Sequence, residues 1–169
     1  MKTIQHNSLP RPILTQTENN TSMWVGHLHN DPTDHFGGQT FVCPAEGLID
    51  NIQVYSDAVQ YPGELTLSLH EFDPRSKTWG PAIGNSVFIL EKKDSSSWIR
   101  FALPAVPVHT GMSYGFRLHT DNALVAIGEA ASGTRQPFTF GHEWNADSRN
   151  EKGNFFSYFS LAFKVELCA

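Results

Sequence analysis

The stretch Phe155-Phe-Ser-Tyr-Phe-Ser-Leu-Ala-Phe-Lys-Val-Glu-Leu167 decides the fold of this chain. Its odd positions are apolar with one exception, and its even positions from 158 onward are small, polar or amphipathic. Because successive side chains of a strand point to opposite faces, this alternation predicts a single β-strand with one buried face. A strand of this length exceeds the usual ~5–6 residues. We therefore expect it to lie centrally in a sheet that a second sheet covers.

Shorter alternating segments precede this stretch, with turn-forming residues between them. We expect strands at 23–29, 38–43, 48–56, 64–72, 85–91, 98–102, 113–120 and 124–130, a short candidate strand at 136–142, and a loop at 143–154. Strands at a spacing of ~10 residues are typical of an all-β sandwich or barrel. The sequence thus predicts an all-β, antiparallel β-sandwich, jelly-roll-like, with nine to ten strands.

The chain of 169 residues suits one domain. Residues 1–22 are polar and show no period, so we expect an N-terminal arm followed by a single β-sandwich domain over 23–169. The first residues lack the apolar core of a signal peptide. The compartment therefore stays open: extracellular or cell-surface if a leader was removed, and otherwise cytoplasmic. The two cysteines, Cys43 and Cys168, are expected to be free thiols because we place them at distant points of the sandwich.

Charge and hydropathy exclude several partners. The formal net charge is −5 and no basic block occurs, so nucleic acid is not an expected partner, because phosphate binding needs clustered Lys and Arg. No apolar run approaches the ~18 residues of a membrane helix, so membrane insertion is not expected either.

A resemblance to a known family rests on several short segments. These are Gly38-Gln-Thr-Phe41, Gly47-Leu-Ile-Asp-Asn-Ile52, Gly63-Glu-Leu-Thr-Leu-Ser-Leu-His-Glu-Phe-Asp73, Trp98-Ile-Arg-Phe-Ala102 and Val108-His-Thr-Gly-Met-Ser-Tyr114. Their succession resembles the galactose-binding-like jelly-roll modules that occur beside glycosidases and on cell surfaces. It covers residues 38–118, about half of the chain. The resemblance implies a non-catalytic, carbohydrate-binding module, and it transfers no individual binding residue because its motifs are structural.

A carbohydrate site needs an aromatic face and a few polar groups. If consecutive strands alternate in direction, alternate loops share one end of the sandwich. That end would gather the predicted ligand-binding residues Trp144, Tyr61, Asp57, Asp34, His35 and Arg149. An alternative stays open for Trp144, whose ring can instead pack beneath its own loop, and Trp79 is expected to be a packed aromatic residue of a turn.

Two other functions remain open. His27 and His29 stand two apart on an expected strand and, with Asp31, offer ligands for a divalent metal, which would suit a metal-dependent cupin-like enzyme. The plainer interpretation is a polar strand end whose aspartates cap turns, with no cofactor. The other alternative is a structural or adhesive subunit, in which residues 1–22 connect copies of a homo-oligomer. Gly111-Met-Ser-Tyr-Gly115 matches the nucleophile-elbow pattern, but a strand rather than a helix is expected after its serine.

Overall fold

The structure, a computed structural model, describes residues 9–132 and 138–169. In these residues the chain forms strands and one short 3₁₀ helix, η1 (Lys92–Asp94). The strands are β1 (Arg11–Gln16), β2 (Thr21–His27), β3 (Asp34–Val42), β4 (Gly47–Tyr61), β5 (Gly63–Asp73), β6 (Thr78–Leu90), β7 (Ser97–Val108), β8 (Ser113–His119), β9 (Leu124–Ala131), β10 (Glu143–Asp147), β11 (Asn150–Phe156), β12 (Phe159–Leu161) and β13 (Phe163–Leu167).

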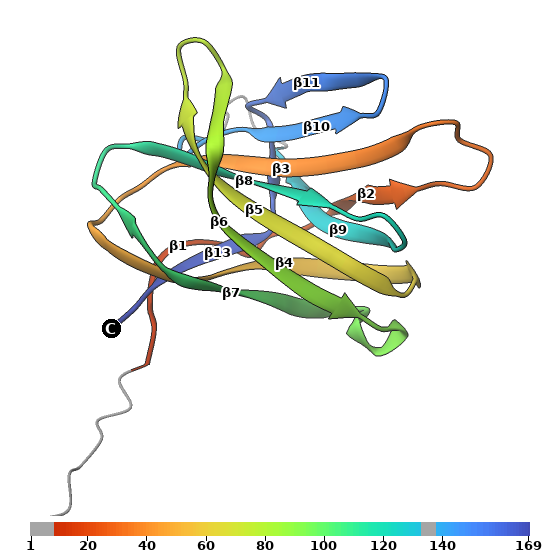
Figure 1. The fold of residues 1–169 in the computed structure, drawn as a ribbon, viewed down its shortest axis with the longest axis horizontal. Coiled ribbons are helices and arrows are strands. Elements are labelled where there is room, and N and C mark those ends of the chain that lie inside the picture. The colour runs from red at the N-terminus through yellow and green to blue at the C-terminus, as the bar shows by residue number, and fades with distance from the viewer. Residues whose placement is uncertain (1–8, 133–137) are drawn as a thin grey trace, which may run out of the picture.

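The strands form two packed layers in which all paired strands are antiparallel (Figure 1). The first sheet contains β1, β13, β4, β9 and β2, with β7 paired to β4 and β12 paired to β9. The second sheet runs β10-β3-β8-β5-β6, with β11 paired to β10. The two are continuous through a short β2–β3 pairing. The predicted antiparallel β-sandwich is confirmed, although thirteen strands occur in the described residues rather than nine to ten.

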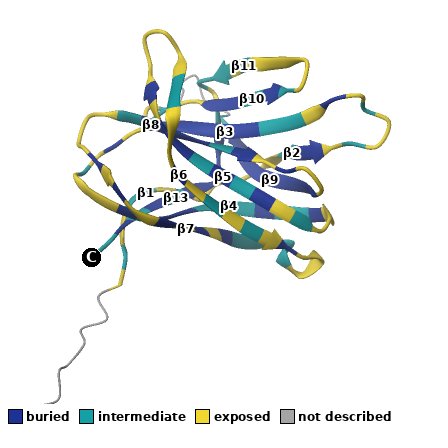
Figure 2. Ribbon diagram, viewed as in Figure 1, coloured by how far each residue is buried: buried dark blue, intermediate teal, exposed yellow. Residues whose placement is uncertain are grey.

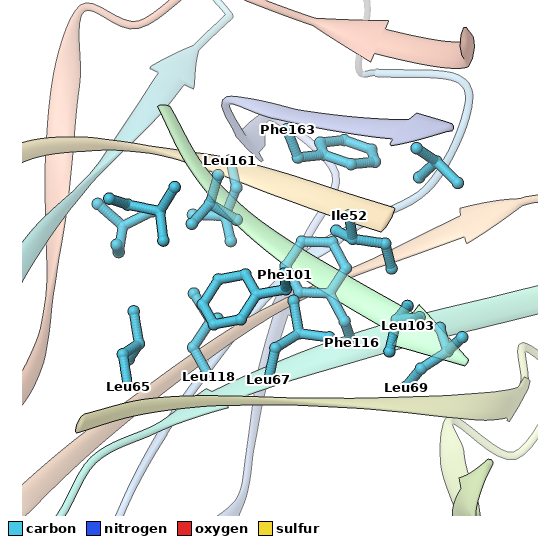
Figure 3. Close-up of a cluster of buried hydrophobic side chains, with 14 of the residues drawn as sticks. Ile52, Leu65, Leu67, Leu69, Phe101, Leu103, Phe116, Leu118, Leu161 and Phe163 are labelled. Carbon is cyan, nitrogen blue, oxygen red and sulfur yellow. The ribbon is translucent and has the colours of Figure 1, made fainter. Parts of the chain in front are cut away.

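The hydrophobic core fills the space between the sheets (Figure 3). Ile52, Phe101 and Phe163 face it from the first sheet, and Leu67 and Phe116 face it from the second. Buried residues alternate with exposed ones along β7, as a pleated strand with one covered face requires, whereas β3 and β9 are buried over most of their length (Figure 2). Burial of this apolar surface is the main free-energy term that holds the sheets together.

The decisive stretch 155–167 is divided among three elements, so the expectation of one continuous strand was wrong. Its first residues end β11, its middle forms β12 beside β9, and its last residues form β13 between β1 and β4. The predicted buried face is present in the second half, where Leu161, Phe163, Val165 and Leu167 are completely buried. Phe159 is only half-buried. The division occurs because the chain changes partner strand twice over this stretch.

The expected loop 143–154 is a β-hairpin, so that prediction was wrong as well. β10 pairs with both β3 and β11. The side chain of Asp147 closes the turn by accepting hydrogen bonds from the backbone N–H groups of Arg149 and Asn150 (2.8 and 2.7 Å). Such side-chain bonds to a turn are a common use of aspartate.

Part of the expected strand at 136–142 lies outside the described residues. Residues 138–142 are not assigned as strand, but they run along β3: the N–H of Thr40 donates to the carbonyl of His142 and that of Val42 to Phe140, both at 2.8 Å. The short candidate is therefore not a regular strand in its described part.

The described part of the expected arm belongs to the sandwich. Residues 11–16 form β1, which pairs along β13 from Arg11 opposite Leu167 to Gln16 opposite Phe163. No helix in the described residues is long and apolar enough to span a membrane.

Both cysteines are free, as predicted. Our placement of the two cysteines rested on Cys168 lying near Met23 of the first strand. Instead, the backbone N–H of Cys168 donates to the carbonyl of Leu48, near the start of β4. Cys43 is buried beyond the end of β3, where burial raises the pKa of its thiol.

Candidate functional site

The turns that the sequence assigned to one end of the sandwich do meet there (Figure 1). The β2–β3 and β10–β11 turns are joined by reciprocal bonds: the N–H of Asp34 donates to the hydroxyl of Ser148, and the N–H of Ser148 to the carbonyl of Asp34, both at 3.0 Å. The N–H of Glu64, after β4, donates to Asn122 in the β8–β9 turn (2.9 Å).

Only some of the predicted ligand-binding residues are brought together at this end: Asp34, His35 and Arg149 lie on or beside the joined β2–β3 and β10–β11 turns. Tyr61, which is 48% exposed, and Asp57 lie on β4 in the first sheet. Arg149 is exposed in the β10–β11 turn of the second sheet. Burial raises the pKa of Asp57, although a hydrogen bond from Ser22 opposes this shift.

The histidines and aspartates near β2 form two separate pairs. Nδ1 of His27 lies 3.0 Å from Asp34, and Nε2 of His35 lies 2.7 Å from Asp31. The bond with His35, together with bonds from Thr33, holds the pKa of Asp31 well below its usual range. Asp31 therefore braces the β2–β3 turn, as the plainer interpretation expected.

The structure does not assemble His27, His29 and Asp31 into a metal centre. His29 is exposed in the turn beyond β2. Within residues 9–132 and 138–169, no group of three or more His, Cys, Asp or Glu side chains is arranged to hold a metal ion.

Trp144 is a packed residue and does not offer an exposed face. It is 3% exposed, and its indole N–H donates to the carbonyl of Lys152 on the paired strand β11 (3.0 Å). Its ring lies against the backbone of Gly38 and meets Trp79 edge to face, with 5.3 Å between centroids. Trp79 also contacts Phe72 at 5.1 Å. Trp79 is therefore a packed aromatic residue, as predicted, and Trp144 follows the alternative that the sequence left open.

These aromatic rings cover one side of the outer face of the second sheet. Trp144, Gly38, Arg117, Ser68 and Asn85 stand opposite one another on β10, β3, β8, β5 and β6. Residues directly opposite in antiparallel strands share a face of the sheet. Their neighbours along β5 and β8 point into the core, so this row faces away from it.

A groove of about 400 Å³ lies over this row; we call it the outer-face groove. Its lining residues are Phe36, Thr66, Ser68, Asn85, Arg117, His119, Trp144 and Glu151. Hydroxyl, amide, imidazole and guanidinium groups thus stand beside the aromatic side chains of Phe36 and Trp144, which is the combination that small-molecule sites commonly use. A smaller hollow of about 140 Å³ beside it is lined mainly by phenylalanines and offers fewer polar groups.

Arg117 lies at the centre of the groove and is held in a fixed position. Its guanidinium stacks against two indoles, 5.1 Å from the ring centroid of Trp79 and 5.8 Å from that of Trp144. Its Nε donates to Nε2 of His70 at 3.4 Å. Burial lowers the pKa of Arg117 from its usual value, because desolvation disfavours the charged form.

His70 is neutral and acts as a brace. Its Nδ1–H donates to the carbonyl of Gly80 at 2.8 Å. Its Nε2 accepts from Nε of Arg117 and therefore carries no proton, so it also accepts from the hydroxyl of Ser68 (2.7 Å). Burial is the largest cause that lowers the pKa of His70, and the positive charge of Arg117 adds to it. The arrangement ties β5, β6 and β8 together beneath the groove.

Most residues of this groove do not stand out in the sequence. Thr66, Ser68, Arg117 and His119 occupy outward positions of alternating strands, and polar residues at such positions are ordinary in any sheet that faces water. The signal in the sequence was Arg117, an arginine between core positions of an expected strand. Its neighbours Trp79 and Trp144 come from segments far away in the sequence, so their contact with Arg117 was not predicted.

A second polar cluster lies inside the sandwich, near the ends of β9 and β10. Glu143 is 2% exposed, and one of its carboxyl oxygens has no hydrogen-bond partner. Burial, together with the neighbouring Glu129, raises the pKa of Glu143 to about 10. At neutral pH Glu143 is therefore a protonated, uncharged acid. A hollow of about 330 Å³ between β2, β9, β10 and the Phe156–Phe159 segment adjoins this pair.

Solved structures of similar fold are known for this chain, but no family is identified. No family model matches the chain, and no curated protein matches it. The chain is similar in fold to a solved structure of the clostridial cysteine protease Cwp84 after propeptide cleavage, with a TM-score of 0.57 and 8% identity over 94% of this chain and 40% of that one. A structure of the cysteine protease and lectin-like domains of this surface-layer-associated protein of Clostridium difficile gives a TM-score of 0.50 and 8% identity, covering 90% and 37%. The chain spans about two fifths of the length of these proteins, and the likeness is one of fold.

Proposed function

We propose that this chain is a non-catalytic carbohydrate-binding module and that the outer-face groove is its binding site. The observation that carries the proposal is the row of Arg117, Ser68 and Asn85, which runs across β8, β5 and β6 beside the aromatic side chains of β3 and β10. A pyranose has an apolar face that packs against aromatic rings and hydroxyl groups that pair with polar side chains. The groove presents both kinds of surface side by side.

The similarity in fold supports this proposal. One of the solved structures of similar fold contains a lectin-like domain, although the identity of 8% carries no binding residue across. The outer-face groove is a different site from the turn end that the sequence predicted. The residues at the turn end, Tyr61, Asp57, Asp34, His35 and Arg149, stay a second prediction, whereas Trp144 contributes to the groove mainly as its packed wall.

A glycan array with the purified chain tests the proposal, followed by titration of the ligand that binds. Phe36→Ala and Asn85→Ala each change one side chain of the groove, while Tyr61→Ala changes the turn end. Loss of the aromatic contact at Phe36 should weaken binding by ~1–3 kcal/mol, and Tyr61→Ala should leave affinity unchanged. Binding that survives both groove variants but not Tyr61→Ala would place the site at the turn end. A clean negative on the array would overturn carbohydrate binding.

One observation favours the alternative of a structural or adhesive subunit. Val87 and Ile89 on β6, the last strand in the order of the second sheet, are 55% and 60% exposed. Exposed apolar side chains on such a strand invite pairing with another chain. Light scattering on the wild type and on Val87→Lys tests this role: a dimer that the variant dissociates would support it, and a wild-type monomer at all concentrations would exclude self-assembly.

A further inference from the structure

The groove contains a guanidinium that no acidic side chain neutralises. Within the described residues, no carboxylate lies within ion-pair distance of Arg117, and the hydrogen bond that it donates goes to the neutral ring of His70. Half-burying a charge without a counterion costs free energy. Burial is the cause of the lowered pKa of Arg117, and no acidic side chain raises this pKa in return.

The surroundings hold this guanidinium ready for a ligand. The two indoles stack on it and His70 occupies Nε, so the terminal nitrogens are the donors that remain without a hydrogen bond among the described residues. A guanidinium presents paired N–H groups whose geometry matches the two oxygens of a carboxylate. A fixed orientation lowers the entropy cost of such binding.

From this geometry we infer that the ligand of the groove is an acidic saccharide, whose uronic-acid carboxylate binds the terminal nitrogens of Arg117. The inference rests on the proposed function and specifies its ligand class. The hydroxyls of Thr66 and Ser68 and the amide of Asn85, which line the same groove, are the partners for the hydroxyls of the sugar ring.

The charges around the groove favour a carboxylate over a more highly charged group. Arg117 is the permanently charged cation of the lining, and Glu151 contributes a carboxylate at the groove wall. The net charge of the chain is −5. A phosphate or a polysulfated chain would need several cations to offset its charge, whereas a carboxylate needs one. One negative charge per sugar residue fits this site.

Trigalacturonic acid and its methyl ester test the inference, because the two probes differ in charge but keep the same ring and hydroxyls. Calorimetric titration should give at least about tenfold tighter binding of the acid, the difference expected of a charge-assisted pair of hydrogen bonds. Arg117→Gln should remove this preference. Arg100→Gln is the matched control, since it removes the same charge from β7 in the first sheet, where Arg100 pairs with Asp50 at 2.7 Å. It should keep the preference.

If Arg117→Gln does not fold, Glu151→Gln provides a second test. Glu151 is exposed, so its substitution should leave the fold intact. Removing its negative charge should tighten binding of the acid about two- to threefold and leave the ester unchanged. Equal affinity of acid and ester in the wild type would overturn the carboxylate inference while the carbohydrate function stands. No binding of either probe, together with no binding on the glycan array, would overturn the proposed function itself.

Discussion

At the scale of the residue, burial separates side chains that the sequence treats alike. Phe159 and Phe163 occupy equivalent positions of the alternating stretch. Phe163 is completely buried, where it contacts the rings of Phe41 and Phe116. Phe159 lies at the margin of the sandwich, packs edge to face on Phe156 and is only partly buried. The two rings therefore contribute differently to stability.

Phe163→Ala should lower the free energy of unfolding by ~3–5 kcal/mol, because it leaves a large cavity in a close-packed core. Phe159→Ala should cost about 1–2 kcal/mol, because part of its ring already contacts water. Urea denaturation of both variants gives the two values. Equal losses would contradict the assignment of Phe159 to the margin.

Glu143 makes stability depend on pH. Its pKa in the folded chain is about 10, above the ordinary value of 4.5, so the folded state binds the proton more tightly than the unfolded state. Proton binding at Glu143 therefore stabilises the folded state. This stabilisation is fully present below about pH 4.5 and is lost progressively as the pH rises from 4.5 towards 10. Glu143→Gln replaces the neutral acid by an amide that does not titrate. The fall in melting temperature between pH 5 and pH 9 should therefore be smaller in Glu143→Gln than in the wild type.

Glu151→Gln is the control for this experiment, because Glu151 is exposed on the adjacent strand β11. It should keep the pH dependence of the wild type. A Glu143→Gln variant whose melting temperature falls as steeply as that of the wild type would show that Glu143 is ionised in the folded chain.

At the scale of the element, the β10–β11 hairpin builds one wall of the groove. Its strands bring Trp144 over Gly38 and Glu151 to the rim. The hairpin can close over the indole because Gly153 has a left-handed φ of +69° and no side chain. A Cβ at this position would lie 2.6 Å from the indole nitrogen of Trp144. The position of the hairpin thus depends on glycine at 153.

Gly153→Ala should destabilise the chain by more than Gly111→Ala. Both glycines have a positive φ, but a Cβ at Gly111, where φ is +81°, would meet no atom within 4 Å. The control should lose about 1 kcal/mol from its backbone conformation alone, and Gly153→Ala should lose a further ~1–3 kcal/mol from overpacking. Thermal melts combined with tryptophan fluorescence measure both effects. Equal losses would show that the hairpin moves away from the indole without cost.

At the scale of the whole molecule, the two faces of the second sheet have different surroundings. Its inner face packs Leu67 and Phe116 into the core, and its outer face carries the groove around Arg117. The same strands serve both faces because their side chains alternate. The first sheet covers the core from the other side, and the continuity through β2 and β3 fixes the two layers relative to each other. A rigid platform of this kind holds the side chains of the outer-face groove in place.

The sequence by itself determined the fold class and much of the core. Alternation with period two is a local property, so the buried positions at Leu161, Phe163, Val165 and Leu167 could be predicted without any partner strand. The prediction of two free cysteines is confirmed, although the position predicted for Cys168 was wrong, because Cys168 lies beside Leu48. The sequence also identified Trp144 and Trp79 as notable residues without assigning their neighbours.

The tertiary structure alone decided the site. Arg117 and Trp144 come from β8 and β10, and His70 and Trp79 come from the β5–β6 hairpin earlier in the chain; the register between these strands places the four side chains in contact. Register depends on pairings between distant segments, which a pattern of alternating residues does not specify. For the same reason the expected loop at 143–154 became a hairpin once β3 offered it an edge to pair with. The free guanidinium in the groove is a product of this assembly, since no single strand contains both Arg117 and the rings that hold it.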